Sequence, residues 1–157
     1  MKIRDFCTTH VVVVEPGASL REASLAMRNA HVGCVVVAER RGGGIFPLGV
    51  VTDRDIVVAV LAPGARPETI RAADAMPAKL AVIGEEQGVH EASRMMAQRG
   101  VRRLPVVRAD VSLCGIVTSG DLARVLAAEL SHLSGAQARS IEQEQLARPS
   151  YGAYSTT

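Results

Sequence analysis

An internal repeat is the feature that most constrains how this 157-residue chain can fold. Residues 5–38 align with residues 74–107 without a gap, a shift of 69 positions that places Glu22-Ala23-Ser24 over Glu91-Ala92-Ser93. The match resumes with a shift of 66, where residues 49–56 lie over residues 115–122. Because a unit of about sixty residues buries little apolar surface alone, we expect two similar units that share one core.

The first copy has three extra residues, which fall in the Gly-rich stretch Arg40-Arg41-Gly42-Gly43-Gly44. This stretch separates two apolar segments, and Gly-rich stretches in such places connect the strands of hairpins. The sequence therefore predicts a hairpin with a lengthened loop in the first copy.

Each copy shows the same order of expected elements: strand, helix, strand, strand, helix. In the first copy, Ser19 and Glu22 have the spacing of a capping box, and Leu20, Ala23 and Met27 follow at helical spacing. Short apolar runs predict the strands, at 11–14, 32–37 and 48–51 in the first copy and at 80–83, 104–107 and 114–117 in the second. The second helices are predicted at 53–61, ended by Pro63-Gly64, and at 119 to about 133.

These elements predict an α+β fold in which two β-α-β-β-α repeats pack sheet to sheet. We expect the first repeat at 1–63, a linker at 64–71, the second repeat at 72–130, and a C-terminal helix with a flexible tail at 131–157. Gly135 is expected to end one helix, residues 136–147 to form another that Pro149 stops, and residues 150–157 to be frayed.

Composition argues against several classes of function. The net charge of +2 is small and aromatic residues make up only 3%, so a nucleic-acid interface built on Arg99, Arg102, Arg103 and Arg108 is the weakest of the hypotheses. Cys7, Cys34 and Cys114 are far apart in the chain and form no C-x-x-C pair, so we expect reduced cysteines and no metal site. No apolar run is long enough to span a bilayer, which favours a cytoplasmic protein.

No sequence pattern of a catalytic site is found, neither a phosphate-binding loop nor a zinc-hydrolase motif nor a nucleophile elbow, and we expect no enzymatic activity. The pattern that repeats is Gly-x-x-Thr-x-x-Asp, present as Gly49/Thr52/Asp55 and as Gly115/Thr118/Asp121. A Thr at a strand end and an Asp on the next helical turn form a small polar site that suits a phosphorylated nucleoside. The alternative is that each pair only caps its helix.

Residues 1 to about 130 resemble a tandem pair of cystathionine-β-synthase (CBS) domains, also called a Bateman module. The resemblance rests on the two Gly-x-x-Thr-x-x-Asp motifs in register, on Asp5 and Asp74 before the first strands, and on the strand Leu104-Pro105-Val106-Val107. The first copy departs from the family there, because Val35-Val36-Val37 has no proline.

The resemblance implies a cleft between the repeats that holds an adenosine-containing regulatory ligand, AMP, ADP, ATP or S-adenosylmethionine, with no cofactor required. It implies phosphate contacts from Arg102 and Arg103, which precede the Leu-Pro strand, opposite Thr52 and Asp55 of the other copy. Arg54 is a further phosphate candidate, and apolar residues near Val11, Val32, Leu80 and Val101 are candidates for the adenine. Gly33-Cys34 match the arginine pair, so we expect the second site, at Thr118 and Asp121, to be less charged.

The leading hypothesis is a freestanding sensor that acts through a dimer contact or an unknown effector protein. The rival is a structural interaction module with an empty cleft. The resemblance also implies a homodimer through the helices, and the apolar residues 56–61, Leu122, Val125 and Leu126 are consistent with it.

Overall fold

The computed structural model describes residues 1–147, so Pro149 and the tail predicted at 150–157 lie outside the described residues. The chain divides into two units, Met1–Asp121 and Leu122–Thr157. Both repeats lie in the first unit apart from most of the last helix. Within residues 1–147, no helix combines the length and the apolar character needed to cross a membrane.

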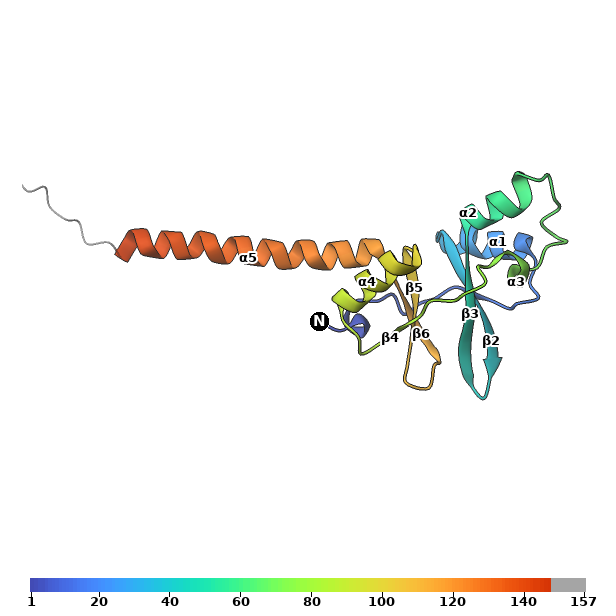
Figure 1. The fold of residues 1–157 in the computed structure, drawn as a ribbon, viewed down its shortest axis with the longest axis horizontal. Coiled ribbons are helices and arrows are strands. Elements are labelled where there is room, and N and C mark those ends of the chain that lie inside the picture. The colour runs from blue at the N-terminus through green and yellow to red at the C-terminus, as the bar shows by residue number, and fades with distance from the viewer. Residues whose placement is uncertain (148–157) are drawn as a thin grey trace, which may run out of the picture. The chain divides into compact units, whose positions relative to one another are not determined.

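Each repeat forms a three-stranded sheet with the same topology, as predicted (Figure 1). In both sheets the first strand pairs in parallel with the second, and the second pairs antiparallel with the third. The strands of the first sheet are β1 (Val13–Val14), β2 (Cys34–Arg41) and β3 (Gly44–Thr52). Those of the second are β4 (Ile83–Gly84), β5 (Arg103–Val107) and β6 (Leu113–Thr118). The repeated register, including a bulge at Val37/Ala38 and again at Val106/Val107, shows that the sequence repeat is a structural one.

The predicted first helix of each copy is present as α1 (Leu20–Ala30) and α4 (Val89–Arg99), and Figure 1 shows each of them beside the sheet of its own repeat. The Ser19–Glu22 capping box is confirmed: Ser19 N donates to Glu22 Oε2 at 2.7 Å, and Glu22 N donates to Ser19 Oγ at 3.2 Å. Both helices end in a left-handed residue, His31 with φ 53° and Gly100 with φ 65°. His31 therefore ends a helix.

The three extra residues of the first copy lengthen the paired strands, and the loop itself stays short. β2 and β3 have 8 and 9 residues, against 5 and 6 in β5 and β6. The turn between them is only Gly42-Gly43, with φ of 55° and 79°. Positive φ at both positions is what a type I′ hairpin turn requires, and glycine adopts it without steric strain.

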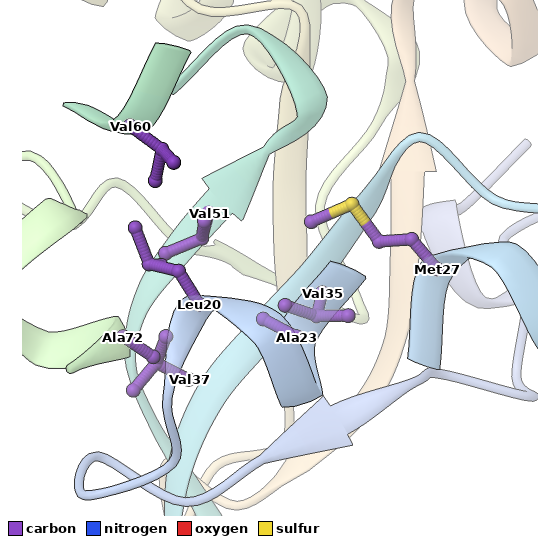
Figure 2. Packing of buried hydrophobic residues seen from close by; sticks show 8 residues of the cluster. All are labelled: Leu20, Ala23, Met27, Val35, Val37, Val51, Val60 and Ala72. Carbon is purple, nitrogen blue, oxygen red and sulfur yellow. The ribbon is translucent and has the colours of Figure 1, made fainter. Parts of the chain in front are cut away.

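The core of the first repeat is aliphatic (Figure 2). Side chains from α1 pack against valines of β2 and β3, and Val60 and Ala72 complete the cluster. Its members are Leu20, Ala23, Met27, Val35, Val37, Val51, Val60 and Ala72. Because Ala72 lies at the start of the second repeat, this core is completed by a residue from outside the first copy.

Each repeat packs against the first segment of the other. The short helix α3 (Ala72–Ala75) lies against the first repeat, where Ala72 N donates to Ala18 O at 2.7 Å. The 3₁₀ turn η1 (Ile3–Asp5) lies against the second, where Ile3 N donates to Gln87 O at 2.8 Å. Ile3 and Ala72 are equivalent under the 69-residue shift, and both are fully buried. The two repeats are thus interlocked at their beginnings.

The helix predicted at 53–61 has two parts, α2 (Asp53–Ile56) and the π-helical η2 (Val57–Leu61). The prediction that Gly135 breaks the last helix is wrong, because α5 runs without interruption from Ser119 to Ala147. A glycine inside a helix costs only about 1 kcal/mol relative to alanine, and the residues around Gly135 are good helix formers. Gly135 also lacks the positive φ that ends α4 at Gly100.

Candidate ligand-binding site

Thr52 and Asp55 form a capping box at the point where β3 ends and α2 begins. Asp55 Oδ2 accepts hydrogen bonds from Thr52 N at 2.8 Å and from Thr52 Oγ1 at 2.7 Å. Asp55 N donates to Thr52 Oγ1 at 3.2 Å. The capping role considered from the sequence is therefore present, and Asp55 Oδ1 takes no part in these three bonds.

The second repeat has the same arrangement. Asp121 Oδ2 accepts from Thr118 N at 2.8 Å and from Thr118 Oγ1 at 2.7 Å. Asp121 is only 7% exposed. The motif therefore fixes the strand-to-helix junction in both repeats, and its Asp is more buried in the second.

A cavity of about 240 Å³ lies at the first junction, and we call it the first cavity. Three arginines, two aspartates and Thr52 contribute its polar groups, and they come from both repeats. The lining residues are Val50, Thr52, Asp53, Arg54, Asp55, Pro77, Gly100, Val101, Arg102 and Arg103. The first cavity thus joins the motif of one copy to the arginine pair of the other.

A smaller hollow of about 50 Å³ shares Val50, Pro77, Val101 and Arg103 with the first cavity, and we call it the annex. Its further lining comes from Gly49 and from residues 79–81, including Leu80. The annex is the more apolar part. Together the two volumes come close to the roughly 300 Å³ at which small-molecule pockets begin.

A second cavity, also of about 240 Å³, lies at the other junction. Its lining residues are Thr8, His10, Val11, Val12, Val32, Gly33, Cys34, Val36, Arg103, Ile116 and Thr118. Most of them are the repeat equivalents of residues in the first cavity and the annex: Val32 corresponds to Val101, and Thr118 to Thr52. The two cavities are therefore related by the internal repeat.

Arg103 is the exception to this symmetry, because it lines both cavities. Its equivalent Cys34 lines only the second. A Cβ atom placed on Gly33 would lie 3.3 Å from Arg103 Nη2 and 3.2 Å from Asp53 Oδ2. The absence of a side chain at Gly33 thus leaves room for both charged groups beside the second cavity.

The pKa of the Cys34 thiol is affected by the same charged groups. Burial raises its pKa above the ordinary value, Arg103 lowers that pKa by charge attraction, and Asp53 raises it further. The thiol therefore stays protonated near neutral pH. Within residues 1–147, no three His, Cys, Asp or Glu side chains are grouped so that they could hold a metal ion.

The structure brings together most of the residues predicted for the site. Thr52, Arg54, Asp55, Val101, Arg102 and Arg103 line the first cavity, Leu80 lines the annex, and Val11, Val32 and Thr118 line the second cavity. Asp121 is not among the residues that line the first cavity, the annex or the second cavity. Arg103 reaches the second cavity as well, which the sequence did not predict.

Sequence reasoning did not select Asp53, Pro77 or Thr8. Asp53 lies inside the first motif and could have been noticed, because its equivalent is the uncharged Ser119. Thr8 and Pro77 are equivalent under the repeat, so identifying either residue as part of the site would have indicated the other.

Comparison with known proteins agrees with the internal repeat. The family model described as CBS domain matches residues 3–62 and again residues 72–128, and the chain therefore belongs to the CBS domain family as a pair of such domains. The CBS domain-containing protein YhcV of Bacillus subtilis is 36% identical over 121 residues, covering 77% of this chain and 82% of that protein. An uncharacterized protein of Methanopyrus kandleri is 33% identical over 115 residues, which are 73% of this chain but only 57% of that protein.

A solved structure extends the likeness to the fold. The CBS domain protein PAE2072 from Pyrobaculum aerophilum, complexed with AMP, has a TM-score of 0.73 and 23% identity, with 84% of this chain and 99% of that one covered. At this identity the likeness concerns the fold alone. The fold is that of a CBS pair, with mixed helix and sheet.

Proposed function

We propose that the chain is a non-enzymatic regulatory module that binds an adenine nucleotide, AMP, ADP or ATP, in the cavities between its two repeats. The observation that carries the proposal is the first cavity, where Arg102 and Arg103 of the second repeat meet Arg54 and the Thr52–Asp55 pair of the first. Guanidinium groups keep their charge at any working pH and bind phosphate oxygens through paired donors.

The remaining groups of the first cavity suit the rest of a nucleotide. Asp55 Oδ1 is not used in the capping bonds and offers an acceptor for ribose hydroxyls, while the annex beside Leu80 and Val101 suits the base. A ligand bound in this way contacts both repeats. It would shift the module toward the arrangement that it binds best, which is how a binding module transmits a signal.

The test is a calorimetric panel of AMP, ADP, ATP, adenosine, S-adenosylmethionine and GTP with the wild-type protein and Arg102→Ala. We expect an adenine nucleotide to bind and Arg102→Ala to weaken it by roughly tenfold or more, because a hydrogen bond to a charged group contributes about 1.5–3 kcal/mol. Adenosine, which has no phosphate, should lose little. Equal losses for AMP and adenosine would contradict the phosphate role.

Asp55→Ala tests the sugar contact, but it also removes a helix cap that is worth about 1 kcal/mol. Glu22→Ala is the matched control, because the Ser19–Glu22 box has the same three hydrogen bonds and lies outside both cavities. Both variants should lose a similar amount of stability, and only Asp55→Ala should lose affinity. If no nucleotide binds to the wild-type protein, the motifs are helix caps only, and the structural interaction module becomes the better hypothesis.

We further propose that the module acts as a homodimer through the α2–η2 helix. Val57, Val58 and Leu61 are 49%, 60% and 71% exposed on this short segment, an apolar surface that a second copy would cover. Val58→Asp should shift the sedimentation coefficient of the protein toward that of the monomer, since a buried charge at an interface is costly. Val111→Asp, at another exposed apolar residue, is the control and should leave the mass unchanged.

A further inference from the structure

Arg103 belongs to two binding volumes at once. Its side chain lines the first cavity, the annex and the second cavity. Arg54 and Arg102 line the first cavity only. Among the residues that line the second cavity, Arg103 alone has a permanent positive charge. An anion in the second cavity therefore depends on a guanidinium that the first cavity also uses.

The surroundings of Arg103 explain how one side chain reaches both volumes. Arg103 lies at the start of β5, directly opposite Thr118 in the strand pair, and is half-buried. Its Nη2 atom and Asp53 Oδ2 both approach the open position at Gly33. Asp53 in turn lines the first cavity and donates its backbone N–H to Gly33 O at 3.2 Å. Arg103, which lines both cavities, thus lies beside Asp53 of the first cavity and Gly33 of the second.

We propose that Arg103 couples the two cavities, so that an anionic ligand in one lowers the affinity of the other for a second anionic ligand. This inference rests on the proposed nucleotide binding. A guanidinium that donates to one phosphate cannot direct the same N–H groups at another. An uncharged nucleoside makes no such demand, so adenosine in one cavity leaves the other unaffected. The module then binds a second phosphorylated ligand with lower affinity than the first.

The equivalent residues Val32 and Val101 allow each cavity to be closed separately. Val32 lines the second cavity only, and Val101 lines the first cavity and the annex but not the second. Val32→Phe and Val101→Phe therefore give two proteins with one open cavity each. Calorimetric titration with AMP gives the intrinsic affinity of each cavity in these variants, and the wild-type titration is compared with the sum of the two.

We expect the second AMP to bind the wild-type protein at least tenfold more weakly than the single-cavity variants predict. Adenosine should match the sum. The coupling should disappear in Arg103→Ala and in Arg103→Gln, which keeps most of the side-chain volume if the alanine variant does not fold. Arg102→Ala is the matched control: it should weaken the first cavity and keep the coupling.

Three results overturn the inference. The wild-type AMP titration equals the sum of the two variants, the coupling persists without Arg103, or AMP binds only one of the single-cavity variants. In each of these cases AMP still binds and the proposed function stands. If AMP binds none of the proteins, the proposed function falls together with the inference.

Discussion

At the scale of single residues, the repeated motif has a structural role that accounts for each of its three defined positions. Thr and Asp close a capping box at both junctions, and Gly lies where the strand passes close to another segment. The sequence predicted that these side chains converge, because their spacing requires it. It could not predict that Arg103 reaches the second cavity, because that depends on the length of one side chain and on the absence of a side chain at Gly33.

The glycine of the first motif is predicted to be sterically required. A Cβ atom on Gly49 would lie 2.2 Å from Met76 Sδ and 2.9 Å from Met76 Cβ, so the start of that side chain would have to move. We expect Gly49→Ala to lower the free energy of unfolding by about 1–3 kcal/mol, as overpacking does. Urea unfolding measures it. Gly17→Ala is the control, since nothing lies within 4 Å of its added Cβ, and an equal loss in both variants would refute the steric explanation.

At the scale of elements, periodicity and turn residues were sufficient to predict the order of strands and helices in both repeats. The α1 capping box and both three-stranded sheets follow from local patterns. The lengthening of β2 and β3 in place of their loop, and the continuous α5, do not, because they depend on the conformation that each glycine adopts. Gly42 and Gly43 have a positive φ and form a turn, whereas Gly135 stays helical.

Because α5 is uninterrupted, we predict that Gly135 lowers the local stability of the helix but does not end it. Gly135→Ala should stabilise the helix by about 1 kcal/mol, because alanine loses less backbone freedom on folding. An added Cβ there would lie 3.4 Å from Arg139 Nη1, an ordinary contact. Amide hydrogen exchange at residues 136–147 should slow by roughly fivefold.

Gly100→Ala provides the contrast for this experiment. Gly100 ends α4 with φ 65°, a conformation that alanine adopts only with strain, so this change should destabilise the protein. If Gly135→Ala speeds exchange, or leaves it unchanged, α5 is broken at this position in solution.

At the scale of the whole molecule, the two repeats are interlocked by the exchange of their first segments. Lys2 bridges to Gly88 in the second repeat, and Arg71 bridges to Ser19 in the first. These two bridges are equivalent under the shift of 69 residues. No local pattern predicts such an exchange, since the segments η1 and α3 are short and their partners lie far away in sequence. The consequence is that neither copy contains all of its own core.

The exchange of first segments predicts that a substitution in η1 destabilises the second repeat. Ile3 is fully buried, and its backbone and that of Arg4 donate to Gln87 and Glu85. Ile3→Ala should therefore cost about 2–5 kcal/mol, the range for truncating a buried aliphatic side chain. Exchange of the amides in β5 and β6 should accelerate by the same factor as global unfolding. Met1→Ala is the control, because Met1 is 66% exposed.

A result confined to the first repeat would contradict the exchange. If Ile3→Ala accelerates exchange in β1–β3 and leaves β5–β6 protected, each copy keeps its own first segment. If both repeats lose protection together, they unfold as one cooperative unit, because the segment that begins the first copy is part of the core of the second. A ligand that contacts both repeats would then stabilise both of them together against unfolding.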